Sequence, residues 1–359
     1  MSLRTEAYVV SEKGAKLELK EITLPPLKSS EVEIKMTHCG LCHTDIHMQN
    51  NDWGITNFPL VPGHEGVGIV SVVGDACRSL KVGDRVGITW IRNSCKSCGM
   101  CQEGRGNLCA KGYQGVYLAS GAGCWGKEPY NEHGGCFSKV MRVEEEWAIK
   151  VPDGLATEAI CPLLCGGGTV FEPVCDYVKL GTTVGVVGIG GLGTAAVKLS
   201  KTAGGVVTAI SRSERKKDAI LKDGAGSFIL SSDPEQMKAA AGSLDVIIDT
   251  TPANADVAQF MDLLKFDGTY CRVGIPEAKD AQFSYNFIPL IFTQKKIAGS
   301  IVTGSRRMNL LCDVVMRNQD YFLNSSEWKA ETVPFAQVNE AMERLVKGEN
   351  KGWRYILAW

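Results

Sequence analysis

The sequence has no run of apolar residues long enough to cross a membrane, which takes about 20 residues. The first ten residues also lack the apolar core of a secretory signal. Neither sign of charge is in excess, because the formal net charge is -1 over 359 residues. That balance argues against nucleic acid or an anionic membrane as the main partner. Together these absences predict a cytoplasmic protein that acts on a small molecule.

Histidine is scarce, with five in the chain, and no repeats or low-complexity segments occur. Cysteine is abundant by contrast, with 14 residues. In a chain without a secretory signal, metal ligation explains such a count better than disulfides do. Half of the cysteines are scattered and are expected to be small buried hydrophobic residues: Cys77, Cys124, Cys136, Cys161, Cys175, Cys271 and Cys312.

The length predicts two domains, because 359 residues exceed one ordinary core. Apolar and polar residues alternate over residues 5–38, 66–73 and 83–88, with glycine-containing turns after them. This pattern is typical of antiparallel strands. The first 150 residues are therefore expected to form a β-rich, barrel-like domain.

From Thr183 onward the pattern changes to an α/β alternation. Apolar runs at 184–187, 206–210, 226–230, 244–249 and 269–273 are separated by helix-length segments at 191–203, 212–222 and 254–265. Such alternation predicts a doubly wound parallel sheet. Two more helices, at 305–317 and 334–347, and a last strand at 353–358 are expected to pack back on the first domain.

Four cysteines lie close together in a C-x2-C-x2-C-x7-C arrangement: Cys95, Cys98, Cys101 and Cys109. Short spacings of this kind present several thiolates to one tetrahedral zinc ion. An iron–sulfur cluster uses similar spacings, but zinc is favoured because another zinc-type site lies nearby in the sequence. With four thiolates the ion has no open position, so the lobe at about 93–112 is predicted to be structural.

A second metal site is suggested by Cys42, His64 and Cys165. Two thiolates and an imidazole would leave a fourth zinc position open to water or a substrate oxygen. Cys39 and Cys161 are rival ligands, since each lies within four residues of a proposed one. A redox pair of Cys39 and Cys42 is also conceivable, as is a zinc protein whose thiols sense oxidation.

Several polar residues accompany these ligands. Asp45 and Glu65 are carboxylates suited to holding the ligating imidazole. Thr44 and His47 could pass a proton between a substrate oxygen and solvent.

A dinucleotide-binding turn follows the apolar strand at 184–187. Its residues are Gly188, Gly190, Gly191, Leu192 and Gly193, in a G-x-G-x-x-G pattern that opens a helix. The glycines allow a tight turn, close approach of the pyrophosphate and close packing of helix on strand. The helix amino terminus then faces the phosphates.

The next strand ends in polar and basic residues where NAD-binding proteins place a carboxylate. Ser211, Arg212 and Ser213 stand there, with Lys216 a helical turn further on. Hydroxyl groups with guanidinium and ammonium suit a 2′-phosphate, so NADP(H) is the predicted cofactor. Glu214 lies in the same segment and is the feature that would favour NAD.

These motifs occur in a recognisable order: G-L-C-H-T-D-I-H, P-G-H-E-G-V-G, the four-cysteine cluster, P-L-L-C-G-G-G-T-V, G-I-G-G-L-G, S-R-S-E-R-K-K and W-R-Y-I-L. The chain thereby resembles, over essentially its whole length, the zinc-containing medium-chain alcohol dehydrogenases, and within them the cinnamyl alcohol dehydrogenase group. The resemblance implies a GroES-like catalytic domain at 1–160 and 300–359, around a Rossmann NADP-binding domain at 161–299.

The resemblance also implies the ligands of a catalytic zinc, namely Cys42, His64 and Cys165. It places Glu65 where it can approach the metal, Thr44 on the substrate oxygen and His47 further along the proton path. By the same match, His43 lies near the cofactor pyrophosphate. A homodimer formed through 285–303 is the family habit, and the apolar segment Phe287–Val302 is expected to be β-rich.

The predicted function is a reversible reduction of aldehydes to primary alcohols with NADPH and two zinc ions, on aromatic or allylic substrates of the cinnamyl type. Trp53 and Trp90 resemble residues that line the pocket of small-alcohol enzymes, so a small aliphatic alcohol or polyol dehydrogenase is the alternative. A non-catalytic NADPH-binding protein is a second alternative. The chain departs from the family at Cys161 and at or near Gly167, where alanine is usual, and in a long segment at 115–135.

Overall fold

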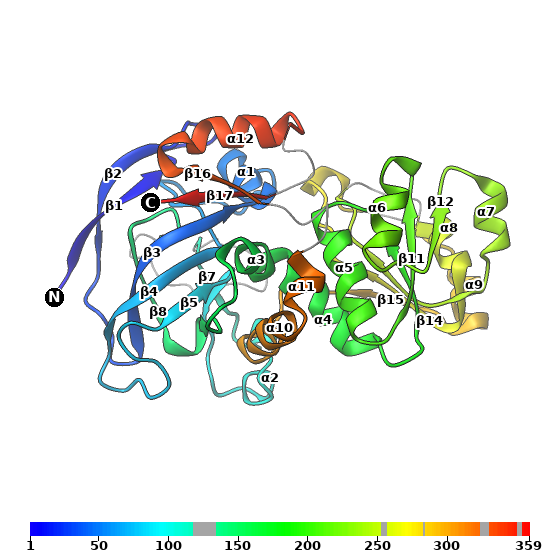
Figure 1. The fold of residues 1–359 in the computed structure, drawn as a ribbon, viewed down its shortest axis with the longest axis horizontal. Coiled ribbons are helices and arrows are strands. Elements are labelled where there is room, and N and C mark those ends of the chain that lie inside the picture. The colour runs from blue at the N-terminus through cyan, green and yellow to red at the C-terminus, as the bar shows by residue number, and fades with distance from the viewer. Residues whose placement is uncertain (118–133, 253–256, 283, 324–329, 350–353) are drawn as a thin grey trace. The chain divides into compact units, whose positions relative to one another are not determined.

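The computed structural model describes residues 1–117, 134–252, 257–282, 284–323, 330–349 and 354–359 (Figure 1). They form two compact units. The first joins Met1–Cys165 to Thr303–Leu323 and to the C-terminal residues, and the second is built from Gly166–Val302. Most of the long 115–135 segment, including Cys124, lies outside the described residues. No helix in the described ranges is both long and apolar enough to span a membrane.

The first unit contains most of the strands. Its strands are β1 (Leu3–Val9), β2 (Glu18–Leu24), β3 (Glu31–Leu41), β4 (Gly66–Val73), β5 (Arg85–Ile88), β6 (Ile91–Asn93), β7 (Gln114–Gly115), β8 (Val140–Glu144), β9 (Ala148–Lys150), β16 (Ala330–Pro334) and β17 (Arg354–Ala358). Its helices are α1 (His43–Asn50), α2 (Gly99–Gln102), α3 (Thr157–Pro162), α10 (Ser305–Arg317), α11 (Gln319–Leu323) and α12 (Val338–Val346).

A seven-stranded sheet organises this unit, in the order β16-β17-β3-β4-β5-β9 with β8 also paired to β3. All of its pairings are antiparallel except β16 with β17, as the alternation in the sequence predicts. The late strand β17 lies beside β3, with Tyr355 opposite Leu41. The last strand of the chain therefore lies beside the carboxyl end of β3, which leads into Cys42 (Figure 1).

The second unit alternates strands and helices. Its strands are β10 (Thr183–Val187), β11 (Val206–Ser211), β12 (Ser227–Leu230), β13 (Leu244–Asp249), β14 (Leu264–Arg272) and β15 (Lys296–Gly299). Its helices are α4 (Gly168–Tyr177), α5 (Gly191–Thr202), α6 (Lys217–Lys222), α7 (Pro234–Ala239), α8 (Val257–Leu263) and α9 (Phe287–Thr293).

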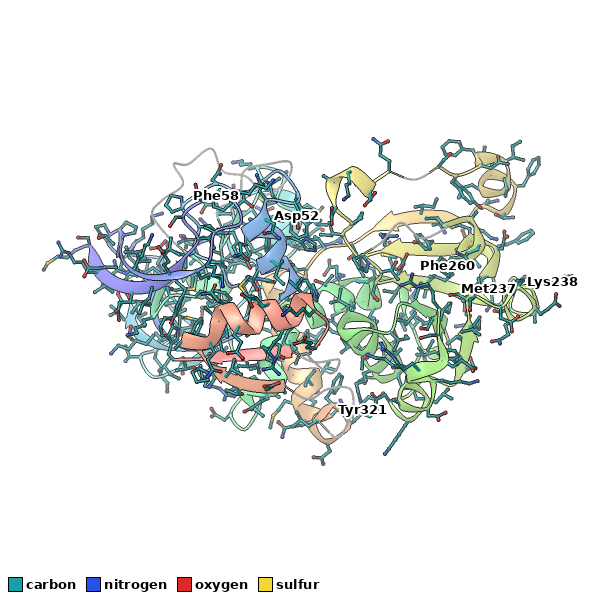
Figure 2. All side chains as sticks on the ribbon, turned by 90° about the horizontal axis from the view of Figure 1, so that it is seen from above. Asp52, Phe58, Met237, Lys238, Phe260 and Tyr321 are labelled. Carbon is teal, nitrogen blue, oxygen red and sulfur yellow. The ribbon has the colours of Figure 1, made fainter. Side chains whose placement is uncertain are left out.

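A six-stranded parallel sheet forms this unit, in the order β12-β11-β10-β13-β14-β15. The order changes direction at β10, as in a doubly wound fold, which confirms the predicted class. The core on one side includes Phe260 of α8, and Met237 of α7 packs against it (Figure 2). Burial of this apolar layer holds the helices on the sheet, at about 25 cal/mol for each Å² removed from water.

Two expectations about local structure were wrong. The helix expected to reach residue 265 ends at Leu263, because Leu264 is buried and pairs with Leu244 at the start of β14. Phe287–Val302 was expected to be β-rich, but its first half is helix α9. The Asn286 side chain accepts a hydrogen bond from the Ile288 backbone N–H, and this cap starts the helix.

Candidate metal centres and dinucleotide site

Four of the predicted site residues meet in the first unit. β3 and β4 are antiparallel with Cys39 opposite Gly66, so the loop after β3 lies beside the residues that precede β4. Cys42 comes from the first loop, and His64 and Glu65 from the second. Cys165 lies in a π-helical turn that follows α3. The ligand atoms of these four residues, here called the mixed site, lie within 4.8 Å of one another.

The His64 ring is arranged as a metal ligand would be. It is 1 % exposed, and its Nε2 atom has no hydrogen-bond partner in the described part of the chain. Its Nδ1 atom lies 2.5 Å from the Tyr117 hydroxyl, which in turn hydrogen-bonds Asp45. A buried polar atom without a partner is costly, and a metal ion would satisfy this one. The donor set of two sulfurs and an imidazole fits zinc.

Asp45 holds the two ligand loops together. Its carboxylate is fully buried and accepts hydrogen bonds from the Cys42 and Gly63 backbone N–H groups, each at 2.9 Å. Its Oδ1 lies 3.7 Å from His64 Nδ1, too far for a direct hydrogen bond. The Tyr117 hydroxyl therefore stands between the Asp45 carboxylate and the imidazole that Asp45 was expected to hold.

The two thiols of the mixed site differ in proton affinity. A hydrogen bond from the Cys165 thiol lowers the pKa of Cys42 well below its ordinary value, and the same bond raises the pKa of Cys165. Zinc binds cysteine as the thiolate, so an ion held by these sulfurs would take the place of thiol protons.

Glu65 belongs to the mixed site, and its side chain is paired with an arginine from the last strand, β17. Its side chain is fully buried, and Arg354 Nη2 of β17 lies 2.7 Å from its Oε1. Burial raises the pKa of Glu65, whereas the Arg354 guanidinium lowers it and favours the ionised carboxylate. Glycine is needed at position 40, since a Cβ there would lie 2.1 Å from Glu65 Oε2.

The rival cysteines lie outside the ligand group. Cys39 and Cys161 are both fully buried, and Cys39 Sγ contacts its neighbouring backbone carbonyl at Gly40. Burial raises the pKa of both thiols well above the ordinary value. Of the other scattered cysteines in the described ranges, Cys175 is partly exposed, and the rest are buried as expected: Cys77, Cys136, Cys271 and Cys312.

Helix α1 carries the residues expected to move a proton. The Thr44 hydroxyl lies 3.5 Å from Cys42 Sγ. One turn later, His47 Nδ1 lies 2.8 Å from Asp52 Oδ2, and its ring stacks on Trp53 with centroids 5.0 Å apart. The imidazole and the carboxylate are both partly exposed, so they reach solvent. His43, at the start of the helix, is exposed.

Trp90 lies directly against the His64 imidazole. Its ring meets His64 edge-on with centroids 5.7 Å apart, and it also packs on Tyr117 at 4.8 Å. The two tryptophans expected to line a pocket therefore contact different residues, since Trp90 packs against His64 and Trp53 against His47.

The four clustered cysteines, here called the cysteine lobe, also come together. Their sulfur atoms lie within 4.8 Å of one another: Cys95, Cys98, Cys101 and Cys109. Backbone N–H groups point at the sulfurs, with the Cys98 N–H 3.4 Å from Cys95 Sγ and the Ala110 N–H 3.4 Å from Cys98 Sγ. Such hydrogen bonds stabilise thiolates and lower the pKa of Cys95 to about 5.

The glycine turn of the second unit has the geometry that a pyrophosphate needs. Gly188 has φ +85°, and a Cβ at Gly193 would lie 1.8 Å from the Gly188 carbonyl oxygen. Gly190 and Gly191 face open space instead, where a ligand can approach the backbone. Leu192 follows in the first turn of α5, whose amino-terminal N–H groups are suited to bind phosphate.

The residues expected to read the 2′-phosphate lie next to that turn. The Gly188 N–H donates to the Ile210 carbonyl at 3.0 Å, which sets Ser211 beside the turn. Ser213 donates its N–H to Ser211 Oγ, while Arg212 is exposed and Lys216 half-buried. The Glu214 carboxylate, the one anionic group of the segment, is paired with Lys217 at 2.7 Å.

Sequence reasoning missed three residues of the first unit. Arg354 stands in the closing W-R-Y-I-L motif, which was recognised without a role for its arginine. Asp52 follows His47 by five positions, in a segment examined only for Trp53. Tyr117 gave no signal, since nothing in its neighbourhood indicates that it would reach His64.

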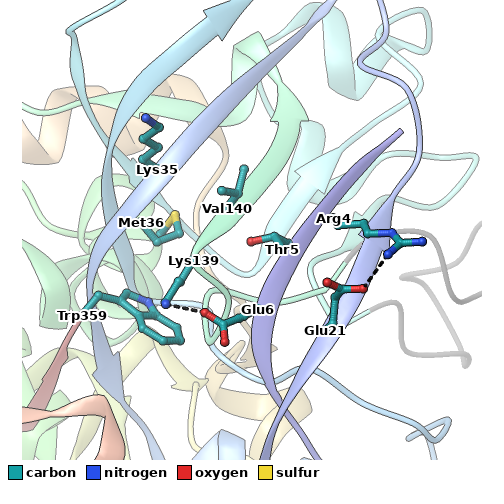
Figure 3. A pocket seen from close by; sticks show the side chains of 9 residues that line it. All are labelled: Arg4, Thr5, Glu6, Glu21, Lys35, Met36, Lys139, Val140 and Trp359. Carbon is teal, nitrogen blue, oxygen red and sulfur yellow. Dashed lines mark hydrogen bonds and ion pairs between the residues drawn. The ribbon is translucent and has the colours of Figure 1, made fainter. Parts of the chain in front are cut away.

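A separate hollow on the first unit contains none of these residues (Figure 3). It measures about 510 Å³. Its charges largely pair with each other, Lys139 with Glu6 at 2.5 Å and Arg4 with Glu21 at 3.4 Å. The lining residues are Arg4, Thr5, Glu6, Glu21, Lys35, Met36, Lys139, Val140 and Trp359.

Comparison with known families gives two matches along the chain. Residues 28–153 match the alcohol dehydrogenase GroES-like domain. Residues 191–316 match the zinc-binding dehydrogenase family. The first match includes the cysteine lobe and three members of the mixed site, and the second begins at the glycine turn.

Individual proteins are similar over nearly the whole chain. A probable mannitol dehydrogenase of Mesembryanthemum crystallinum is 39% identical, over 93% of this chain and 91% of its own. Cinnamyl alcohol dehydrogenase 7 of Arabidopsis thaliana is 40% identical, over 91% and 88%. Among solved structures, the cinnamyl alcohol dehydrogenase of Helicobacter pylori complexed with NADP(H) is 28% identical, with a TM-score of 0.85 over 100% of this chain and 99% of that one.

Proposed function

Because the chain belongs to the zinc-binding alcohol dehydrogenases of the cinnamyl alcohol dehydrogenase type, we propose that it interconverts aldehydes and primary alcohols with NADP(H). The observation that carries the proposal is the mixed site, in which the buried Nε2 of His64 has no partner among the described residues and faces two sulfurs. Aromatic and allylic alcohols are the proposed substrates.

We assign a zinc ion to Cys42, His64 and Cys165, and a second one to the cysteine lobe. The bound zinc would polarise the substrate carbonyl as a Lewis acid, while the reduced nicotinamide supplies the hydride. The lobe has four sulfur ligands and therefore keeps no place for substrate. The mixed site has only three ligands besides the Glu65 carboxylate, which leaves a position for the substrate oxygen.

Thr44, His47 and Asp52 are the proposed proton path. The Thr44 hydroxyl, beside Cys42 Sγ, can donate to a substrate oxygen held in the mixed site. His47 takes up or supplies the proton at the solvent side, and Asp52 holds its ring by a 2.8 Å contact at Nδ1. A carboxylate on one ring nitrogen leaves the other nitrogen available to exchange a proton.

Glu65 is the proposed alternative contact of the metal. It is buried within reach of the other ligand atoms and is held by Arg354. If this carboxylate approaches the zinc ion as the substrate leaves, the ion would keep four ligands while substrate and product exchange.

The cofactor preference is assigned to Ser211, Arg212, Ser213 and Lys216. The pairing of Glu214 with Lys217 removes the main objection to a 2′-phosphate at this place. Replacing Ser211 with Asp and Arg212 with Ile should lower kcat/KM for NADPH by about tenfold to a hundredfold while leaving NADH little affected, since charge-assisted hydrogen bonds to phosphate are lost. Equal losses with both cofactors would contradict the assignment.

Substrate class is tested by a panel of acetaldehyde, hexanal, benzaldehyde and cinnamaldehyde under saturating NADPH and then NADH. The proposal expects the highest kcat/KM for the aromatic and allylic aldehydes. A small-alcohol or polyol dehydrogenase is the second candidate, favoured by Trp90, whose ring packs against His64 and takes up space at the metal. Preference for acetaldehyde would establish it, and a zinc-replete protein without turnover would instead indicate a binding protein.

We further propose a homodimer that uses the outer face of α9 and the edge strand β15. Four apolar side chains of α9 are between 63% and 82% exposed: Phe287, Ile288, Ile291 and Phe292. β15 is the last strand of its sheet, so its outer backbone groups are open to a second strand. Sedimentation should show a dimer that the change of Ile291 and Phe292 to Glu converts to a monomer; a monomeric wild type would refute this.

A further inference from the structure

Three neighbouring strands of the second unit end side by side. The registers place Val187 of β10 opposite Asp249 of β13, and Asp249 opposite Arg272 of β14. In parallel sheets, ligands bind beyond these carboxyl ends, and the glycine turn begins directly after Val187. Asp249 and Arg272 thus lie at the carboxyl edge of the sheet, where dinucleotide sites are built. No sequence motif identifies either residue.

The Asp249 carboxylate is fully buried, and both of its oxygens are used. Oδ1 accepts hydrogen bonds from the Thr251 backbone N–H at 2.8 Å and from its hydroxyl at 2.7 Å. Oδ2 accepts from the Tyr270 hydroxyl and from Arg272 Nη1, the latter at 3.1 Å. One side chain therefore fixes the turn after β13 to the strand β14.

The Arg272 guanidinium extends this connection to two backbone segments. Its Nη2 donates to the Thr251 carbonyl and its Nε to the Gly274 carbonyl, each at 3.0 Å. The planar fork of arginine reaches Asp249 and both carbonyls at once, which a lysine cannot do. Arg272 thereby joins the turn at 249–251 to the turn that follows β14.

The turn at 249–251 packs directly on the glycine turn. Thr250 donates its hydroxyl to the Gly188 carbonyl at 2.8 Å, and a Cβ at Gly188 would meet Thr251 Cγ2 at 2.7 Å. A Cβ at Gly274 would meet the Thr251 carbonyl oxygen at 2.0 Å. With no free space between these segments, a displacement of Thr250 and Thr251 must move the glycine turn.

We propose that Asp249 and Arg272 are positioning residues for the dinucleotide: they hold the turn at 249–251 against Gly188 and so preform the pyrophosphate site. The proposal rests on the function proposed above, because it presumes a dinucleotide at this turn. A preformed site binds more tightly because less order must be imposed on binding. The cluster acts on the shared part of the cofactor, so NADPH and NADH should depend on it equally.

A matched pair for comparison exists at the opposite end of the same two strands. Asp245 of β13 accepts hydrogen bonds from the Thr183 N–H at 2.8 Å and its hydroxyl at 2.7 Å, and Lys265 Nζ of β14 lies 2.9 Å from it. This pair also joins the two strands through an aspartate and a cation, but it lies away from the glycine turn, and its side chains are 42 % and 41 % exposed whereas Asp249 is fully buried. It therefore reports the effect of losing a contact between these strands, and the Tm of each variant shows the difference in stability.

The test measures dissociation constants of NADPH and NADH by fluorescence titration of the zinc-replete protein, with Tm recorded for each variant. Arg272→Lys should keep the charge beside Asp249 and weaken binding of both cofactors by about tenfold, since the two hydrogen bonds to backbone carbonyls are lost. Lys265→Met should leave both constants unchanged. Tyr270→Phe removes one hydrogen bond to Asp249 and should weaken binding by about threefold, which keeps the test informative if the arginine variant unfolds.

Unchanged affinity in Arg272→Lys and Tyr270→Phe would overturn the positioning role while leaving the proposed function intact. The same holds if Lys265→Met weakens binding as much as Arg272→Lys, because the effect would then be general destabilisation. Loss of NADPH affinity alone would also overturn it, since the cluster lies at the pyrophosphate turn and not at the 2′-phosphate. A wild-type protein that binds neither cofactor would refute the proposed function itself.

Discussion

The cysteine lobe gathers its four sulfurs from within a single loop, whereas the mixed site combines the loop after β3, the residues before β4 and a turn at Cys165. In the lobe, neighbouring backbone N–H groups contact the sulfurs. In the mixed site, side chains from distant parts of the chain hold the group in place, with Tyr117 on His64 and Arg354 on Glu65. A local loop is enough to bring four sulfurs together, but the mixed site needs segments from the whole first unit.

The two sites also differ in charge. With a divalent zinc, four thiolates would leave a net negative centre, and two of the lobe cysteines are partly exposed, so solvent can stabilise it. The mixed site is mostly buried and contains two cysteines, an imidazole and a carboxylate beside one guanidinium. A charge in that setting is balanced inside the protein, and Arg354 supplies a counter-charge to Glu65.

The largest expected contrast comes from Cys165→Ala against Cys161→Ala. Loss of Cys165 removes a proposed zinc ligand and should lower kcat by roughly a thousandfold or more, because Lewis-acid assistance is worth several kcal/mol. Cys161 is buried four residues earlier and outside the ligand group, so its variant should keep activity. Aldehyde reduction and zinc content of both variants check this; a fully active Cys165→Ala protein would sink the assignment.

In the cysteine lobe, by contrast, loss of a ligand should lower stability and leave kcat nearly unchanged. Cys98→Ser removes one of four sulfur ligands and should lower Tm by on the order of 10 °C, since a structural zinc contributes directly to folding. At low temperature, kcat of the remaining folded protein should change little. Differential scanning fluorimetry and initial rates provide the measurement. If kcat fell while Tm stayed constant, the division into a structural and a reactive site would be wrong.

The buried charge pair of the mixed site should couple strongly. Arg354→Met leaves the Glu65 carboxylate without its partner and should cost about 3–5 kcal/mol of unfolding free energy. The double variant with Glu65→Gln should recover much of that loss, because neither charge remains. Chemical denaturation of the two single variants and the double variant measures the coupling. Additive losses would mean that the 2.7 Å contact contributes little.

The smallest effect is expected from Tyr117→Phe. The change removes the hydroxyl that links His64 to Asp45 and should weaken zinc affinity of the mixed site by about tenfold. The zinc affinity is measured by competition with a chromogenic chelator. The Cys165→Ala variant, which lacks one proposed ligand of the mixed site, first identifies which of the two zinc ions exchanges faster. Unchanged competition would show that the Tyr117 hydroxyl does not orient the ring.

The sequence was most informative where the structure is locally determined. The order of strands and helices followed from alternation and glycine turns, and the cysteine lobe followed from spacing alone. Choosing Cys42 and Cys165 over their rivals needed the family resemblance, because burial of Cys39 and Cys161 is a tertiary property. Arg354 and Tyr117 could not be assigned from sequence, since their partners lie 289 and 53 positions away.

In α9, by contrast, the sequence pattern did not predict the local structure. Residues 287–292 are apolar throughout and have no period that distinguishes helix from strand. A single polar residue before it, Asn286, determines the outcome by capping the first turn. Likewise, the role proposed for Arg272 depends on strand register, which brings it opposite Asp249 and which no local pattern encodes.

The pairing of β17 with β3 also means that the mixed site can be completed only late in synthesis. Arg354 follows Glu65 by 289 positions, and the whole second unit is made in between. At about 5–20 residues per second, roughly 15–60 s pass before the guanidinium that neutralises this carboxylate exists. During that time β3 lacks its β17 neighbour, while the cysteine lobe already has all its ligands. The four sulfurs of the lobe can thus come together first, and the mixed site is completed last.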